Sequence, residues 1–337
     1  MADSRAEARL DFARQHLGRP LQIEVASADA SFRSYWRVRD DAQTWIVMDA
    51  PPDKEDTRPW LDIGARLHRA GLHTPDVLAC DLGQGFVLME DLGTRTYLPE
   101  LSAATADALY ADACTALSRM QSVDTNGLPV FDRAQMVMEM ELMPEWFLRR
   151  HLRFAPSCEQ WDIVEAAFTF LVQSALEQPR CFMHRDYHSR NLLITAADSP
   201  GVIDFQGAML GPLTYDLASL LRDCYIVWPR ERVDAWAEQY RLRFSANTDA
   251  AIFRRWFDLI GLQRHIKVLG IFCRLCYRDG KAGYLDDLPR VLAYVLDIAR
   301  AYPELVDFAA LLAHAVGTRD IRVLNPESRI AAATCAR

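Results

Sequence analysis

The feature that most constrains this chain is the segment His184–Asn191, taken together with Asp204 shortly after it. Asp186 and Asn191 are five residues apart, and Asp204 follows the apolar pair Val202–Ile203. Polar groups placed beside short apolar runs are typical of loops that leave buried strands and carry chemistry. We therefore expect a fold in which these two loops contribute to one site.

These residue types at this spacing match the needs of phosphoryl transfer from a metal-bound nucleotide. Asp186 is the candidate base for the attacking hydroxyl, while Asn191 and Asp204 are candidate ligands of Mg²⁺, with ATP as the donor. The spacing agrees with the kinase pattern H-R-D-x-x-x-x-N followed by an Asp-Phe pair, although Gln206 replaces the usual Gly. His184 is expected to support the loop through backbone hydrogen bonds. A polar turn is the alternative, since Asp, Asn and His favour turns.

The pattern along the chain divides it into a β-rich part and a helical part. Residues 1–92 contain one short helical pattern at 5–17, about five strand patterns and a helix near 60–70. Residues 93–337 carry long helical patterns with two short strands at 192–194 and 202–203. The expected helices are 102–122, 134–150, 158–177, 214–226, 231–244, 250–278, 287–301 and 304–315. We predict an α+β protein of two lobes, 1–92 and 93–337, with ligands bound between them.

The loop between the first two strands is the candidate phosphate-covering loop. Its Ser31, Phe32 and Arg33 are expected to contact the nucleotide, although the loop lacks glycine and an ordinary hairpin turn is the alternative. The third strand, residues 45–49, has no lysine to pair with phosphates. Arg33 or Lys54 could take that place, and the sequence leaves the choice open.

Roles for three further residues, Glu90, Leu92 and Asp216, are predicted from the sequence around them. Glu90 and Leu92 end the β-rich part and are expected to bind adenine through the Glu90 carbonyl and the Leu92 amide. The alternative there is a strand that ends in a glycine turn. Asp216, in the first turn of a predicted helix, is expected to accept hydrogen bonds from the backbone of the catalytic loop.

A basic stripe marks the helical pattern 250–278. Arg264, Lys267, Arg274 and Arg278 fall within an arc of about 80° at 3.6 residues per turn. A solvated basic face is the ordinary interpretation. The sharper one assigns Arg264 and Lys267 to an anionic part of the acceptor, such as a carboxylate.

Composition limits the partners. The formal net charge is −8, which argues against nucleic acid or an anionic membrane as the main partner. Charges interrupt the first residues, and no apolar run reaches the roughly 18 residues of a membrane-spanning helix. We expect a soluble cytoplasmic protein that acts on a small molecule. Protein partners and oligomeric state cannot be predicted from the sequence.

The chain resembles the aminoglycoside phosphotransferase superfamily, which has a protein-kinase-like fold. The resemblance covers nearly the whole chain and is most specific at His184–Asn191, Ile203–Phe205 and Tyr215–Ala218. Within that superfamily it is most similar to the bacterial anomeric kinases of N-acetylmuramate and N-acetylglucosamine. The residues that carry this second likeness are Asp29–Arg33, Met48–Pro52, Glu90–Gly93, Gln263–Gly270 and Arg278–Lys281.

The resemblance implies transfer of the γ-phosphoryl group of ATP to the 1-hydroxyl of an amino sugar in peptidoglycan recycling. It also implies that the missing strand lysine and the glycine-poor loop are ordinary in this group, and that the helical lobe binds the sugar. We add the inference that the lactyl carboxylate of muramate suits Arg264 and Lys267.

Two alternatives stay open. The acceptor could be an aminoglycoside or another small alcohol, but a polycationic antibiotic calls for acidic residues near the C-terminus, and residues 331–337 contain none. A catalytically silent nucleotide-binding module is the other alternative. The presence of Asp186, Asn191 and Asp204 together argues against it.

Overall fold

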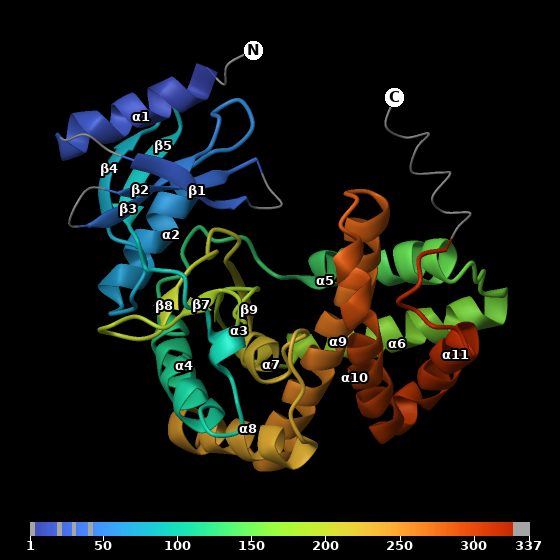
Figure 1. The fold of residues 1–337 in the computed structure, drawn as a ribbon. Coiled ribbons are helices and arrows are strands. Elements are labelled where there is room, and N and C mark those ends of the chain that lie inside the picture. Colours follow the sequence, from blue (N-terminus) through green and yellow to red (C-terminus); the bar gives the residue numbers. More distant parts are fainter. Residues whose placement is uncertain (1–3, 19–21, 29–31, 40–42, 326–337) are drawn as a thin grey trace. The chain divides into compact units, whose positions relative to one another are not determined.

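The computed structural model describes residues 4–18, 22–28, 32–39 and 43–325 (Figure 1). The chain forms two compact units, Met1–Asp124 with Arg190–Ala208, and Thr125–Ser189 with Met209–Arg337. The chain passes from the second unit into the first between Ser189 and Arg190, inside the predicted catalytic loop. The predicted boundary after Leu92 falls within the first unit, and the division into 1–92 and 93–337 stays a prediction.

A five-stranded antiparallel sheet forms the framework of the first unit (Figure 1). Its strands follow the spatial order β1-β2-β3-β5-β4, so that β5 separates β3 from β4. The prediction of about five strands in this part of the chain is confirmed. The strand bounds are β1 Gln22–Ala28, β2 Ser34–Arg39, β3 Thr44–Asp49, β4 Val77–Asp81 and β5 Phe86–Glu90.

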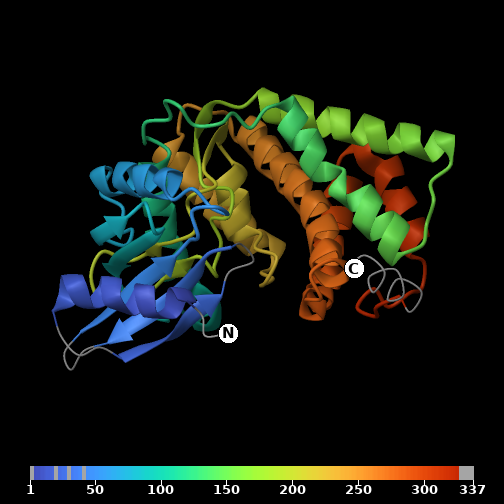
Figure 2. The same cartoon turned by 90° about the horizontal axis from the view of Figure 1, so that it is seen from above.

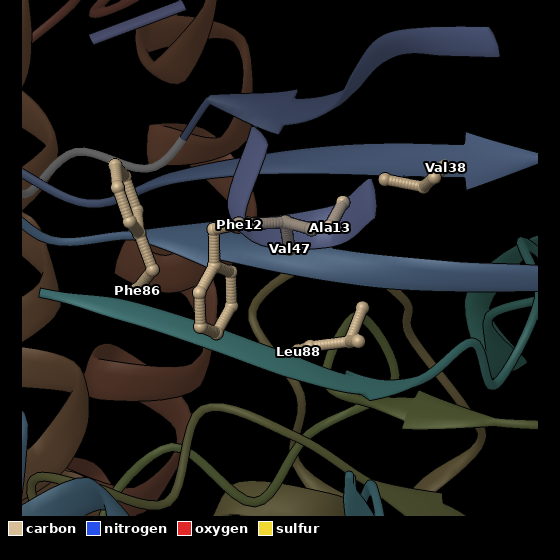
Figure 3. Packing of buried hydrophobic residues seen from close by; sticks show 6 residues of the cluster. All are labelled: Phe12, Ala13, Val38, Val47, Phe86 and Leu88. Atoms are coloured by element: carbon tan, nitrogen blue, oxygen red, sulfur yellow. The ribbon is translucent and has the colours of Figure 1, made fainter. Parts of the chain in front are cut away.

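Helix α1, Ser4–Leu17, covers part of this sheet with apolar side chains. Phe12 and Ala13 lie on one side of the helix and point at the strands (Figure 3). Burial of such side chains is the main favourable contribution to folding. The strand residues that they meet are Val38, Val47, Phe86 and Leu88.

A buried carboxylate also ties α1 to the sheet. Asp49, at the end of β3, accepts a hydrogen bond from Arg9 Nη1 at 2.6 Å and from Arg5 Nε at 2.8 Å. Asp49 and Arg9 are both buried, and a buried charge is tolerated only when it is paired in this way.

The first unit also contains a small two-stranded ladder, with Asn191 just before its first strand and Asp204 shortly after its second. β7, Leu192–Leu193, pairs with β8, Gly201–Val202, near the two predicted strands. The ring of Phe205, just after β8, lies 5.2 Å from that of Trp60 in α2. The helices of this unit are α2 Arg58–Arg69, α3 Tyr97–Glu100 and α4 Ala106–Met120.

The second unit is built around the long helix α9, Ala250–Tyr277, drawn in orange in Figure 2. This helix packs against residues 143–151, 158–176, 215–221 and 288–301. A two-stranded ladder of β6, Arg180–Met183, and β9, Met209–Pro212, was not expected, because neither four-residue segment shows a strand periodicity. No helix in the described ranges is long and apolar enough to span a membrane. The other helices are α5 Arg133–Met140, α6 Cys158–Leu176, α7 Tyr215–Leu221, α8 Arg230–Phe244, η2 Ala282–Asp287, α10 Leu288–Ala301, η3 Pro303–Leu305 and α11 Val306–Val316.

The continuous helix expected at 134–150 is wrong. The structure has α5 up to Met140 and then the π-helix η1, Met143–His151. Pro144 interrupts the α-helical pattern, because proline has no N–H to donate to the preceding turn. At the junction Gly270 of α9 approaches the Leu142 backbone so closely that a methyl group would overlap the Leu142 carbonyl.

This close approach predicts that Gly270→Ala destabilises the protein. The added methyl group has no space beside the Leu142 backbone, so the helices must separate, at a cost of about 1–3 kcal/mol. Urea denaturation followed by circular dichroism measures the change. Gly283→Ala is the matched control, because nothing lies within 4 Å of its added carbon. Equal stability of the two variants would contradict the packing argument.

Candidate active site

In the first unit the ladder of β7 and β8 brings Asn191 and Asp204 together. Asn191 immediately precedes β7, and Ile203, which follows β8, donates its backbone N–H to the Asn191 carbonyl at 3.1 Å. The Asn191 amide nitrogen then donates to Asp204 Oδ2 at 3.3 Å. The Asn191 amide and the Asp204 carboxylate, which come from two segments of the chain, are therefore in direct contact.

Gln206 provides a second partner for the Asp204 carboxylate. Its Nε2 donates to Asp204 Oδ1 at 2.7 Å, so the residue found where kinases usually have glycine orients the carboxylate. Asp204 itself has a φ of 65°, in the left-handed region that few residues other than glycine adopt. Such conformations persist where the surroundings hold them, and they occur often at functional sites.

Arg33 lies beside the same carboxylate. Its side chain is buried, with Nη2 at 3.9 Å from Asp204 Oδ1 and Nη1 at 3.7 Å from Glu55 Oε1. Lys54, the other candidate cation, has a side chain that is 53% exposed and lies 3.5 Å from Asp53 Oδ2. Of the two, only Arg33 is found next to Asp204.

The other predicted nucleotide-binding residues have mixed placements. Phe32 is 65% exposed, and Ser31 lies outside the described residues. At the end of β5 the Glu90 carboxylate lies 3.1 Å from His73 Nε2, and the side chain of Leu92 is buried.

The segment after β5 is held by an ion pair that sequence reasoning missed. Arg37 of β2 donates to Asp91 through Nε at 2.6 Å and through Nη2 at 3.0 Å. Asp91 Oδ1 also accepts the backbone N–H of Gly93 at 3.0 Å. These bonds fix the backbone that contains Glu90 and Leu92.

In the second unit the predicted catalytic loop is anchored on Asp216. Its carboxylate accepts the backbone N–H of His184 at 2.6 Å and that of Arg185 at 3.0 Å, which are contacts of the kind expected from the sequence. The His184 ring in turn accepts the backbone N–H of Asp186 through Nδ1 at 3.3 Å. Three consecutive backbone donors of the loop are thus satisfied by two side chains.

Asp186 and Asp216 lie in opposite electrostatic environments. Burial alone disfavours the charged form of Asp186, but Lys267, His188 and Arg264 outweigh it and lower the pKa of this carboxyl to about 2. For Asp216 burial prevails over the hydrogen bonds and raises its pKa to about 6. Asp186 is therefore ionised throughout the neutral range.

The cations near Asp186 belong to the stripe predicted on α9. Arg264 and Lys267 are both buried, so the interpretation of a solvated face is wrong for these two, whereas Arg278 is exposed. Lys267 Nζ lies 3.1 Å from Glu139 Oε1, and the same oxygen accepts a hydrogen bond from Arg185 Nη2 at 2.5 Å.

Arg264 differs from Lys267 in its bonding. Its Nη1 is buried and has no hydrogen-bond partner among the described residues. Burial by itself would lower the pKa of Arg264, but the charges of nearby groups, Cys224 and Tyr215 before Asp186 and Asp223, raise it. A buried donor without a partner is costly, and such a group is usually satisfied by water or a ligand.

Two acidic residues of this site were missed from the sequence. Glu139 balances Lys267 and Arg185, and Asp223 accepts the backbone N–H of Ser189 at 3.0 Å. For Glu139 a signal exists, because a lone carboxylate stands between Met138 and Met140 in a short helix. Asp223 carries no comparable signal.

Comparison with known proteins adds three findings. Residues 22–254 match the family model described as "Phosphotransferase enzyme family". A protein of Pseudomonas aeruginosa named N-acetylmuramate/N-acetylglucosamine kinase is 44% identical over 303 residues, which cover 87% of this chain and 88% of that protein. A protein of Neisseria meningitidis with the same name is 38% identical over 314 residues, covering 90% and 93%.

Solved structures share the fold. An ADP-bound aminoglycoside phosphotransferase superposes with a TM-score of 0.59 at 16% identity, covering 88% of this chain and 99% of that one. An ethanolamine kinase of Plasmodium vivax gives 0.61 at 11% identity, covering 90% of each. The prediction of an α+β, protein-kinase-like fold is confirmed.

The anchoring of the loop predicts that Asp216→Asn lowers the free energy of unfolding. The amide keeps the shape but loses the charge, and its NH₂ group cannot accept an N–H. One of the two hydrogen bonds from His184 and Arg185 is therefore lost, which costs about 1–3 kcal/mol. Chemical denaturation at neutral pH measures it. Asp307→Asn, at an exposed position of α11, is the matched control. A loss no greater than that of the control would remove the anchoring role.

Proposed function

Because the chain belongs to the phosphotransferase enzyme family, we propose that it transfers the γ-phosphoryl group of ATP to the anomeric 1-hydroxyl of N-acetylmuramate, N-acetylglucosamine or both. The observation that carries this proposal is the 44% identity, over 87% of the chain, to a relative named for these two substrates. The product is a sugar 1-phosphate, and we place the reaction in the cytoplasm within peptidoglycan recycling.

Asp186 acts on the acceptor hydroxyl. Because its pKa is lowered to about 2, the carboxylate is ionised at neutral pH and accepts a hydrogen bond from the sugar. Phosphoryl transfer through a loose transition state demands more from positioning than from strong basicity. The anomeric hydroxyl is also more acidic than other sugar hydroxyls. A weakly basic carboxylate, on a loop whose backbone N–H groups are bound by His184 and Asp216, suits both conditions.

Asn191 and Asp204 are proposed to hold Mg²⁺. Their contact at 3.3 Å places an amide and a carboxylate together, and hard oxygen donors fit this ion, which takes few protein ligands and is otherwise bound by phosphates and water. When bound, the ion neutralises charge on the phosphates. Gln206 keeps the Asp204 carboxylate oriented.

The nucleotide contacts are proposed on the segments around the sheet of the first unit. The Glu90 carbonyl and the Leu92 amide bind adenine, and Phe32 offers an exposed apolar ring. Arg33 supplies positive charge beside Asp204. Ser31 keeps its predicted role in the phosphate-covering loop.

For the acceptor the proposal distinguishes the two cations of α9. Lys267 already contacts Glu139, whereas Nη1 of Arg264 is buried and finds no hydrogen-bond partner in the part of the chain that the structure describes. We therefore assign the lactyl carboxylate of muramate chiefly to Arg264, and Lys267 to the charge balance around Asp186.

An ATP-consumption screen over amino sugars, aminoglycosides and choline, with phosphorus NMR of the product, tests the proposed function. We expect turnover with the two amino sugars and a phosphorus signal coupled to the anomeric proton. Asp186→Asn should lower kcat by about 10²-fold or more and leave the Kd for ATP unchanged. Asp286→Asn, at an exposed position, serves as the control. Turnover only with aminoglycosides or choline, or a 6-phosphate product, would refute the assignment.

The role of Arg264 predicts a difference between the two sugars. Arg264→Ala should raise the KM for N-acetylmuramate by about tenfold or more, the loss expected for a charged hydrogen bond. The KM for N-acetylglucosamine, which lacks the carboxylate, should change much less. Steady-state kinetics with both sugars on one preparation provide the measurement. A similar rise for both would remove the carboxylate contact.

A further inference from the structure

We propose that Arg33, positioned by Glu55, is the cation that binds the β- and γ-phosphates of ATP in place of the lysine that this chain lacks. The inference rests on the proposed function, because it requires a nucleotide triphosphate at Asp204. From the sequence, either Arg33 or Lys54 could supply this charge.

The usual position for this cation is not available on β3. That strand contains no lysine or arginine, and its last residue is the acidic Asp49. The Asp49 carboxylate is occupied by Arg5 and Arg9 of α1, so these three charges serve the packing of helix and sheet. A cation for the phosphates must come from a neighbouring segment.

Arg33 is placed to supply it. The residue immediately precedes β2, whose first residue, Ser34, pairs with Asp49 in the antiparallel ladder. Arg33 therefore starts from the strand adjacent to β3 and at the end of β3 where Asp49 lies. From there its guanidinium reaches to 3.9 Å from the Asp204 carboxylate.

The charge environment of Arg33 suits a group that exchanges one partner. It lies between two carboxylates, at 3.7 Å from Glu55 and 3.9 Å from Asp204, distances beyond the usual range of a charge-assisted hydrogen bond. When Asp204 binds a metal ion, Arg33 keeps Glu55 as its counter-ion and donates through its other terminal nitrogen to phosphate oxygens. A guanidinium is well matched to phosphate because its donors form a planar fork.

Burial strengthens this interaction relative to an exposed cation. Arg33 is 7% exposed, so its charge is screened by water much less than that of Lys54, whose side chain is 53% exposed. Glu55 lies near Nη1 of the guanidinium, whereas Nη2 is the nitrogen near Asp204. It is thus a positioning residue, which acts on the nucleotide through Arg33.

Equilibrium binding of a nucleotide series tests the inference without relying on turnover. The Kd for ATP, ADP, AMP and adenosine is measured by titration calorimetry in Mg²⁺ buffer for the full chain. Arg33→Met should weaken ATP and ADP by roughly ten- to a hundredfold and leave adenosine unchanged. Arg33→Lys should recover part of the loss, and Glu55→Gln should weaken ATP by less than Arg33→Met. Lys54→Met, the matched control, should change every Kd by less than about threefold, as for an exposed ion pair.

Each outcome separates the inference from the proposed function. If Arg33→Met binds ATP as the wild type does, or if Lys54→Met shows the loss instead, the assignment of Arg33 is wrong while the kinase proposal stands. If the wild type fails to bind ATP, the proposed function itself fails. Should Arg33→Met not fold by circular dichroism, Arg33→Lys and Glu55→Gln decide, and unchanged Kd values in both would overturn the inference.

Discussion

The conformation of the catalytic loop depends on one buried carboxylate. Arg185 has a φ of 78°, in a region that costs a residue other than glycine about 1–2 kcal/mol. Asp216 offsets this cost, because it accepts the N–H groups of both His184 and Arg185, and bonds to a charged acceptor are about twice as strong as neutral ones. Burial disfavours the ionised form of the Asp216 carboxyl, whereas these two hydrogen bonds favour it. The strained backbone at Arg185 fixes the direction in which the side chain of the next residue, Asp186, projects from the loop.

The second constraint in this unit is charge balance. Lys267 and Arg185 share one oxygen of Glu139, and Lys267 also keeps Asp186 ionised. Without Glu139 the buried Lys267 and the half-buried Arg185 would lack this counter-ion, and an unbalanced buried charge is costly. Glu139 therefore lets this unit keep Asp186 ionised without an excess of positive charge around it. The same balance explains why Lys267 is a poor candidate for a substrate contact.

The sequence alone predicted the parts of the protein in which chemistry or periodicity is local. The offsets from His184 to Asn191, the five strands of the sheet and long helices such as α9 follow from spacing within a short window. Contacts between distant segments were not predictable, because no local pattern records which helix will face a given loop. Glu139, which meets Lys267, and Glu55, which lies near Arg33, are of this kind. The two lobes expected at 1–92 and 93–337, and the roles of the site residues, stay predictions.

The two departures of this chain from the kinase pattern both concern groups around the Asp204 carboxylate. Gln206 stands where glycine is usual, and β3 lacks a lysine, yet both differences concern groups around Asp204. Gln206 donates to one oxygen of that carboxylate, which gives it a fixed orientation that a mobile glycine segment would not. Arg33, which we propose as the replacing cation, immediately precedes β2 and is buried beside Asp204. The two changes are compatible with each other, since a carboxylate held by Gln206 gives Arg33 a stationary partner.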